Sequence, residues 1–271
     1  MNQHPKLAIV GFGTMGQAIS AGLVEASGYP AARIQVATRH PAAVRGRAEA
    51  LGVGLSQEVV PAVKAAEVVL LCVKPKELKR LLADLTAAGA LDHRPLVVSI
   101  AAGTTLAFLA DHTPAGTPLV RAMPNTPCAI RRGMTVLAAG QGVSEAQLAV
   151  ARTLFAPLGR VMELDEQHMD AVTGLSASGP AFMFVILESL AEGGVQCGLP
   201  RAVAVELAAQ MTLGAASMVL ETGRHPAALK DEVTTPAGCT IAGLMVLEDG
   251  RIRSVVARGI ERATQVAAGL G

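Results

Sequence analysis

Three glycines near the start of the chain restrict its possible fold more than any other feature. Gly11, Gly13 and Gly16 form a G-x-G-x-x-G motif between the apolar run "LAIV" and the helix-like segment "MGQAISAGLVEA". In this context the first glycine permits a tight turn, the second lets a pyrophosphate approach the backbone, and the third lets helix and strand pack closely. The N–H groups at the start of the helix would then bind the phosphates. The residues predicted to form this dinucleotide loop are Gly11, Phe12, Gly13, Thr14, Met15 and Gly16.

The first 164 residues alternate between two periodicities. Short β-rich runs such as "RIQVAT", "VVLLCV" and "PLVVSI" alternate with segments such as "ELKRLLADLTAAG", whose apolar residues recur at helical spacing. Strands that are apolar throughout and separated by helices are typical of a parallel sheet covered on both faces. Two later strands, "GMTVLAAG" and "RVMELD", flank a helix that begins at a capping box from Ser144 to Gln147. We therefore predict an α/β domain over residues 1–164, with a doubly wound, mainly parallel sheet of the Rossmann type.

Residues 165–271 show helical patterns and weak strand signals. The most informative helix covers Pro200 to Glu221, where the charged residues are Arg201, Glu206 and Glu221. A helix that is apolar on all sides must be surrounded, and a helical segment of about a hundred residues offers too little material to surround it. We expect a second copy of the chain to complete the core, which makes this part an all-α dimerisation domain. The alternative is burial of this helix within one subunit.

Composition and charge argue against a nucleic-acid partner. Hydrophobic residues make up 51% of the chain and charged residues 17%, so a folded, apolar core is expected. The 23 basic and 22 acidic side chains give a net charge of +1, and the chain has no tryptophan, one tyrosine and five phenylalanines. Neither a basic patch nor a set of stacking aromatics is available for nucleic acid. We expect no nucleic-acid partner.

The sequence also favours a cytoplasmic location. The longest uncharged run, Leu7 to Val24, is interrupted by four glycines, which indicates strand, turn and helix rather than a membrane span or a signal peptide. The cysteines are far apart, with neither a CxxC pair nor histidines at ligand spacing, so free thiols and no metal are expected. These cysteines are Cys72, Cys128, Cys197 and Cys239.

The residues after the second strand predict which dinucleotide is bound. An NAD site would place an acidic residue about 20 positions past the glycines to accept the ribose hydroxyls. This chain instead has Thr38, Arg39 and His40 there. A guanidinium suits a 2′-phosphate, so Thr38 and Arg39 predict NADPH in preference to NADH. The alternative is that Arg39 is a solvated loop charge, and NADH use stays possible.

Two further loops are expected at the cofactor, because ligands bind beyond the carboxyl ends of parallel strands. The first is "CVKP" and the second is "AAG", each of which directly follows a predicted strand. The residues predicted to contact the cofactor there are Val73, Lys74, Pro75, Ala101, Ala102 and Gly103.

A third loop, "PNTP", follows the strand "LVRAM". The carboxamide of Asn125 in this loop could orient a nicotinamide, and prolines on both sides stiffen the loop. The alternative is an ordinary turn built from asparagine and proline.

Six segments carry a resemblance to one enzyme family. They are "GFGTMG", "VKP", "AMPNTP", "DAVTGLSASGPAF", "EGGVQCGLPR" and "HPAALKDEVTTPAGCTIAGLMVLE". In this order they cover nearly the whole chain, which resembles the pyrroline-5-carboxylate reductases. The resemblance implies reduction of L-1-pyrroline-5-carboxylate to L-proline by NAD(P)H, the last step of proline biosynthesis. It also implies a Rossmann-like domain and a helical domain that intertwines with its partner in a homodimer, with some members assembling dimers into decamers.

The stretch "TTPAGCTIAG" is predicted to bind the substrate. If "TIAGLMVLE" is a helix, the amides from Ala237 to Thr240 have no intrahelical partner and form an anion site for the substrate's carboxylate. The resemblance implies that Thr240 is the catalytic hydroxyl, which we expect to donate to the ring nitrogen. Because a hydroxyl is a poor general acid, Thr240 would mainly orient an imine that is already protonated or is protonated by water. The alternative is that Thr240 only caps the helix. The substrate-binding residues predicted here are Ala237, Gly238, Cys239 and Thr240.

The segment "GLSASGPAF" is expected to form the opposing wall of the substrate pocket. Ser176 and Ser178 offer hydroxyls, and Gly179 with Pro180 would start the following helix. Many members of the family have tyrosine where Phe182 stands, so a phenol has no part in the reaction of this chain. Ser176, Ser178 and Gly179 complete the predicted substrate-binding residues.

Other functions remain as alternatives. The β-hydroxyacid dehydrogenases share the glycine motif and a helical second domain, but they need a catalytic lysine, and this chain has no lysine from Glu166 to His225. An NADP-dependent reductase of another cyclic imine or hydroxyacid is the alternative enzyme. An NADP-binding sensor that has lost its activity is the alternative outside enzymes.

Overall fold

The chain divides into two compact units. The structure, a computed structural model, describes residues 4–269. One unit comprises the chain up to Ser178 together with the C-terminal residues from Arg262 onward, and the other is Gly179–Glu261. The predicted boundary after residue 164 follows the change from strands to helices along the sequence, and it stays a prediction.

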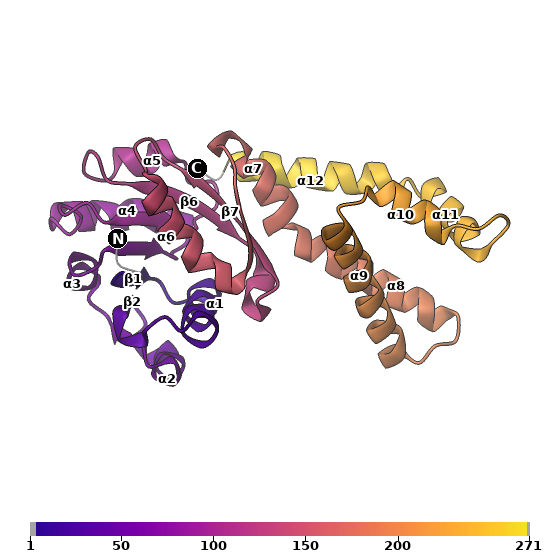
Figure 1. The fold of residues 1–271 in the computed structure, drawn as a ribbon, viewed down its shortest axis with the longest axis horizontal. Coiled ribbons are helices and arrows are strands. Elements are labelled where there is room, and N and C mark those ends of the chain that lie inside the picture. The colour runs from indigo at the N-terminus through magenta and orange to yellow at the C-terminus, as the bar shows by residue number, and fades with distance from the viewer. Residues whose placement is uncertain (1–3, 270–271) are drawn as a thin grey trace. The chain divides into compact units, whose positions relative to one another are not determined.

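An eight-stranded sheet forms the centre of the first unit (Figure 1). The strand order is β3-β2-β1-β4-β5-β6-β7-β8, and neighbours are parallel except β6 and β7, which are antiparallel. The strands are β1 (Leu7–Val10), β2 (Ile34–Ala37), β3 (Gly54–Ser56), β4 (Val68–Leu71), β5 (Leu96–Ser99), β6 (Leu119–Pro124), β7 (Gly133–Ala139) and β8 (Gly159–Glu163). The predicted doubly wound, mainly parallel sheet is confirmed. The short β3 was not predicted, because three residues carry little periodic signal.

Helices connect these strands. They are α1 (Thr14–Ala21), α2 (Pro41–Leu51), α3 (Val59–Lys64), α4 (Pro75–Ala87), α5 (Leu106–Asp111) and α6 (Glu145–Phe155), and α7 (Met169–Val172) follows β8. The predicted capping box at α6 is confirmed: the Ser144 hydroxyl accepts from the Gln147 amide at 3.3 Å, and the Gln147 side chain accepts from the Ser144 amide at 2.9 Å.

Side chains that alternate along each strand build two apolar cores, one on each face of the sheet. On β1, Leu7 and Ile9 belong to a cluster that includes residues of α1, α2 and α6, whereas Ala8 and Val10 belong to one that includes residues of α3, α4 and α5. Both faces are therefore covered, as a parallel sheet requires. A third, smaller cluster lies where β6 and β7 run antiparallel, and α7 covers it with Met169.

The second unit is helical, and its buried hydrophobic residues are Ala191, Ala204, Ala208 and Leu229. Its helices are α8 (Gly179–Gln196), α9 (Arg201–Thr222), α10 (Pro226–Val233) and α11 (Cys239–Asp249), and α12 (Ile252–Ala268) begins in it. Helices α8 and α9 approach each other closely at small residues, because a Cβ atom on Gly194 would lie 3.1 Å from that of Ala204. The buried residues of α9 are Ala204 and Ala208.

The apolar residues of α9 are largely exposed in the single chain. Leu207, Met211, Leu213 and Leu220 are each more than half exposed. Burial of this helix within one subunit, the alternative to a partner copy, is therefore wrong. By length and composition alone, Glu166–Gln196 and Arg201–Thr222 are also the two described stretches that could cross a membrane. The expected absence of a membrane partner stays a prediction.

The single tyrosine lies in the loop before β2, where its ring is buried. Its hydroxyl donates to the carbonyl oxygen of Pro5, and burial raises the pKa of Tyr29 to about 12. The chain has no tryptophan, so phenolate absorbance reports on this one group.

We expect alkaline pH to destabilise the fold through Tyr29. In the unfolded chain a tyrosine ionises near pH 10, about two pH units below the folded value, so between these values the folded protein holds a proton that the unfolded chain has lost. Stability is then fully present below pH 10 and falls by roughly 2 to 3 kcal/mol as the pH rises to 12. Denaturant unfolding at pH 9 to 12 checks this, with Tyr29→Phe as the variant that lacks this part of the loss. Burial also raises the pKa of the Cys72 and Cys128 thiols, and the loss that they cause is common to both proteins. A native phenolate signal at pH 10 would contradict it.

Candidate active site

The glycine motif forms the turn between β1 and α1, where close contacts require Gly11 and Gly16 and leave Gly13 open. Gly11 has a φ of +94°, and a Cβ atom there would lie 2.7 Å from the Cys72 carbonyl oxygen at the end of β4. A Cβ on Gly16 would lie 2.6 Å from the Gly11 carbonyl oxygen, so this glycine lets α1 pack on the turn. Gly13 is the N-cap of α1, and a Cβ there would meet nothing within 4 Å. The open side of the loop is therefore at Gly13, where a phosphate group has room.

The other predicted loop residues flank this opening. Phe12 is buried, and its carbonyl oxygen accepts from the Gln17 side chain at 3.0 Å, which fixes the turn. Thr14 and Met15 occupy the first turn of α1, where the amides have no intrahelical acceptor. The turn thus points unpaired N–H groups and the positive end of the α1 dipole toward one place.

A cleft of about 880 Å³ lies beside this turn, at the carboxyl ends of β1, β2 and β4. The strand order reverses between β1 and β4, and ligands of doubly wound sheets bind at this switch point. One wall of the cleft is formed by α4, with Glu77 and Arg80 among its residues. The predicted cofactor residues that line the cleft are Gly11, Gly13, Thr38, Arg39, Val73 and Lys74.

Cationic side chains outnumber anionic ones in this cleft. Arg39, Lys74, Lys76 and Arg80 line it together with Glu77 and Asp84. An excess of positive charge suits a ligand that carries several phosphates. Because an open Gly13 and a cationic wall occur together, the residues present fit NADP.

Two residues of α4 were missed by the sequence analysis. Glu77 forms an ion pair with Arg39, and Asp84 lies 3.8 Å from Arg80. The Arg39 side chain is 65% exposed, so its pair with Glu77 contributes little stability and an incoming anion can replace the carboxylate. The sequence did offer a signal for Glu77, because this residue lies in the first turn of α4, directly after the "VKP" loop that was expected at the cofactor.

The "AAG" loop after β5 is held close to the sheet. The Ala101 amide donates to the Ser99 hydroxyl at 3.3 Å, and Ala102 packs against the third apolar cluster. Gly103 has a φ of +72°, which turns the chain toward α5. The loop therefore has a fixed path beyond the end of β5, the edge at which the cofactor is expected.

Asn125, after β6, joins two loops that the sequence analysis assigned to different ligands. Its Oδ1 atom accepts from the Met134 amide at 2.9 Å, and its Nδ2 donates to the Ser176 carbonyl oxygen at 3.2 Å. The Ser176 hydroxyl lies 3.4 Å from the same Nδ2 atom. The carboxamide thus fixes the serine segment to the sheet, and its predicted contact with a nicotinamide stays a prediction.

The serine segment is helical before α8 begins. A π-helical turn covers Thr173–Ala177, and the Ser178 amide donates to the Thr173 carbonyl oxygen at 3.0 Å. Helix α8 begins at Gly179, as predicted, but the preceding helical turns were not foreseen. A single π turn has no distinct sequence period, although such turns are frequent at functional sites.

In the second unit, the predicted substrate residues form the start of α11. A turn across Thr235–Gly238 places Pro236 and Ala237 at its two central positions, and Ala237 has a φ of +57°, a conformation that favours glycine. The N-cap of α11 is Gly238, without a side-chain capping bond, so the alternative that Thr240 caps the helix is wrong.

The prediction of four unconsumed amides there needs one correction. The Gly238 amide donates to the Thr235 carbonyl oxygen at 3.0 Å, because the turn closes on itself. The amides of Ala237, Cys239 and Thr240, and the Thr240 hydroxyl, have no hydrogen-bond acceptor within residues 4–269. An anion site at this helix start therefore has three backbone donors and one hydroxyl.

A glycine turn at the switch point of a doubly wound sheet, beside a cationic cleft, defines an oxidoreductase of the dinucleotide-binding class. Comparisons with known proteins agree with this class. The family "NADP oxidoreductase coenzyme F420-dependent" matches residues 6–103, and "Pyrroline-5-carboxylate reductase dimerisation" matches residues 166–270.

Whole-chain relatives define the family. The pyrroline-5-carboxylate reductase of Synechocystis sp. is 44% identical over 98% of both chains, and that of Glycine max is 39% identical over 96% of this chain and 93% of the relative. The solved reductase of Coxiella burnetii superposes with a TM-score of 0.92 at 33% identity over 99% of both chains. The Plasmodium falciparum enzyme, solved with NADP bound, gives 0.89 at 25% identity and full coverage. The chain belongs to the pyrroline-5-carboxylate reductase family.

The glycine geometry predicts opposite outcomes for two alanine substitutions. Gly13→Ala should fold normally, because its φ is −77° and the added Cβ meets nothing, but NADPH should bind at least about tenfold more weakly. Gly11→Ala should lower the free energy of unfolding by several kcal/mol, because φ is positive and the Cβ meets a backbone carbonyl. Thermal unfolding and NADPH fluorescence titration check both variants. Undiminished NADPH binding by Gly13→Ala would contradict the assignment of the open side.

Proposed function

We propose that this protein reduces L-1-pyrroline-5-carboxylate to L-proline with NADPH, the last step of proline biosynthesis, in the cytoplasm. The observation that carries the proposal is a cationic cleft beside the glycine turn, in a chain whose relatives along its whole length are pyrroline-5-carboxylate reductases. Reduction of a cyclic imine needs a hydride donor over the C=N carbon and a proton or a strong hydrogen bond on the nitrogen. NADPH supplies the hydride when it is bound.

The first unit would hold the cofactor. The α1 amides and the open side of Gly13 bind the pyrophosphate, and Thr38 with Arg39 binds the 2′-phosphate. Val73–Pro75 and Ala101–Gly103 border the cofactor beyond the ends of β4 and β5. Asn125 stays a proposed cofactor neighbour, although its carboxamide already bonds to Ser176.

Four groups at the start of α11 would bind the substrate. The amides of Ala237, Cys239 and Thr240 bind its carboxylate, since they have no other acceptor within the described chain. Gly238 contributes space rather than a donor, because its own amide is occupied. The Thr240 hydroxyl orients the imine: it donates to the nitrogen of the neutral imine, whose proton then comes from water, or it accepts from the N–H of an imine that is already protonated.

Ser176, Ser178 and Gly179 are the remaining proposed substrate residues. The Ser176 hydroxyl is already within 3.4 Å of Asn125, so its orientation is set by the sheet. Ser178 is partly exposed and offers its hydroxyl at the end of the π-helical turn.

A second copy of the chain is the proposed partner of the second unit. The match to a dimerisation family over residues 166–270 supports association, and α9 exposes leucines and methionines that a homodimer would cover. This explains the apolar helices without a membrane, since α9 also carries Arg201 and Glu206. Assembly of dimers into decamers, and the absence of nucleic-acid partners, stay proposals.

Cofactor preference should depend on Arg39 and on its competitor Glu77. Arg39→Ala should weaken NADPH binding about tenfold or more and leave NADH binding nearly unchanged, because only NADPH carries the 2′-phosphate. Glu77→Gln should tighten NADPH binding a few-fold, since the guanidinium is released and an anion is removed. Equilibrium titration of each cofactor without substrate measures these changes.

Asp84→Asn is the matched control for Glu77→Gln. It removes the same charge from the same cleft, but Asp84 pairs with Arg80 rather than with Arg39. Equal tightening by both variants would show a general effect of charge and would contradict the competition. In an Arg39→Ala background, the effect of Glu77→Gln should shrink to the general effect of charge that Asp84→Asn shows.

NADPH oxidation with L-1-pyrroline-5-carboxylate tests the proposed reaction and the assignment of Thr240. Thr240→Val keeps the shape of the side chain and removes its donor, so kcat/KM should fall about 100-fold while NADPH binding is unchanged. Thr240→Ser should retain most of the activity. Full activity of Thr240→Val would remove the hydroxyl from the mechanism.

The same assay separates the alternatives. Turnover of a six-membered imine in preference to the five-membered one would favour another imine reductase. NADPH binding without turnover of any imine would favour a sensor. Either result would end the proposed function.

A further inference from the structure

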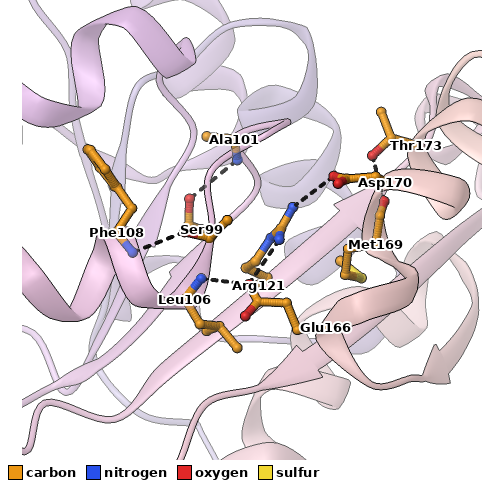
Figure 2. A network of polar contacts seen from close by, with 10 residues as sticks. Ser99, Ala101, Leu106, Phe108, Arg121, Glu166, Met169, Asp170 and Thr173 are labelled. Carbon is orange, nitrogen blue, oxygen red and sulfur yellow. Dashed lines mark hydrogen bonds and ion pairs between the residues drawn. The ribbon is translucent and has the colours of Figure 1, made fainter. Parts of the chain in front are cut away.

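One buried arginine lies on β6, four residues before Asn125, and the reaction as proposed does not use it. Arg121, in the middle of β6, is 3% exposed. Its neighbours on the same face of the strand, Leu119 and Met123, belong to two different apolar clusters. Figure 2 shows the guanidinium between the carboxylates of Glu166 and Asp170. Its Nη1 lies 2.9 Å from Glu166 Oε1, and its Nη2 lies 3.9 Å from Asp170 Oδ1.

The Glu166 carboxylate also connects the arginine to the loop after β5. The same Oε1 atom accepts from the Leu106 amide at 2.6 Å, at the first residue of α5 (Figure 2). Ser99, the register partner of Arg121 on β5, accepts from the Ala101 amide where the same loop begins. The loop 101–105 is thus held at its start by Ser99 on β5 and at its end, through Glu166, by Arg121 on β6.

The segment 166–178 is tied to β6 at a second point, through Asn125 and Ser176. Four residues of strand, from Arg121 to Asn125, extend about 13 Å. Six to ten residues of helix, from Glu166 or Asp170 to Ser176, extend about 9 to 15 Å. The two spacings match, so the segment lies along β6 and is fixed at both ends. A segment that is held at two points cannot slide along the strand.

An apolar side chain at position 121 would have a smaller desolvation cost than the guanidinium has. A buried ion pair gives little net stability, and apolar replacements are often neutral or stabilising. The Nε and Nη2 atoms of Arg121 also have no hydrogen-bond partner within the described residues, which makes the guanidinium more costly to bury. What the arginine provides, and an apolar group does not, is a directed hydrogen bond to Glu166 together with an electrostatic attraction to Asp170.

We propose that Arg121 is a positioning residue for the reaction. Through Glu166 and Asp170 it sets where the segment with Ser176 and Ser178 lies on the sheet, and through Glu166 it sets where the loop 101–105 ends. The proposal rests on the proposed function for its kinetic consequence. Its structural consequence, an ordered segment 166–178, does not depend on the identity of the substrate.

Hydrogen exchange and steady-state kinetics of Arg121→Met test the proposal. The methionine fills the space without a charge, and Glu166, which is about one-third exposed, can be hydrated. We expect the amides of 166–178 to exchange about tenfold faster or more, while those of β1 and α1 are unchanged. KM for the imine should rise about tenfold with a smaller loss of kcat, and the affinity for NADPH should stay within about twofold.

Three further variants sharpen the test. Arg121→Lys, which keeps the charge, should restore part of the protection and part of KM. Glu166→Gln, which keeps the acceptor for Leu106 but not the charge, should give an effect smaller than that of Arg121→Met. Arg152→Met is the matched control, because Arg152 pairs with Glu145 and Glu163 at the surface of the same unit and should change neither readout.

The outcomes separate this proposal from the proposed function. Unchanged exchange and KM in Arg121→Met, or equal changes in Arg152→Met, would overturn the positioning assignment. If Arg121→Met does not fold, Arg121→Lys and Glu166→Gln decide the question by the same two readouts. If the wild-type protein does not reduce the imine, the proposed function fails, and exchange over 166–178 still decides whether Arg121 orders the segment.

Discussion

The close backbone contact between the β1–α1 turn and the end of β4 is the constraint on which the cofactor site depends. Gly11 lies so near the Cys72 carbonyl that no side chain fits, and Gly16 lies as near to Gly11. These two contacts bring the start of α1 down onto the carboxyl edge of the sheet at the switch point. The α1 amides, Gly13 and the cleft beside it then share one location, and a phosphate-bearing ligand can reach all of them.

Charge in the cleft completes this arrangement. The sheet and its two apolar cores supply a fixed edge, and α4 adds a wall where lysines and arginines outnumber acids. Arg39 is held by Glu77 through an exposed ion pair, which is weak because water screens it. The arginine is thus kept near the position where a 2′-phosphate is expected, without a strong bond that the phosphate must break.

Polar contacts of a different kind join the sheet to the helical segment that precedes α8. Arg121 lies on β6, and Asn125 directly follows this strand. Arg121 pairs with Glu166 and Asp170, and Asn125 donates to the Ser176 carbonyl oxygen. Apolar packing by Met169 would allow several nearby positions, because dispersion contacts are not directional. Hydrogen bonds and ion pairs have defined geometry, so they select one position of the serine-bearing turn.

The sequence by itself determined the fold class, the glycine loop, the capping box of α6 and the apolar character of α9. Each of these follows from residues close together in the chain, whose spacing reflects the helix or strand period or a local turn. Only the tertiary structure decided that Glu77 meets Arg39, that Glu166 meets Arg121 and that Asn125 meets Ser176. These partners are 38, 45 and 51 positions apart, and no local period relates them. The sequence also did not predict that the Gly238 amide is occupied, because this hydrogen bond depends on the backbone path of the turn and not on its residue types. Local spacing fixes which elements form, whereas long-range packing fixes which side chains meet.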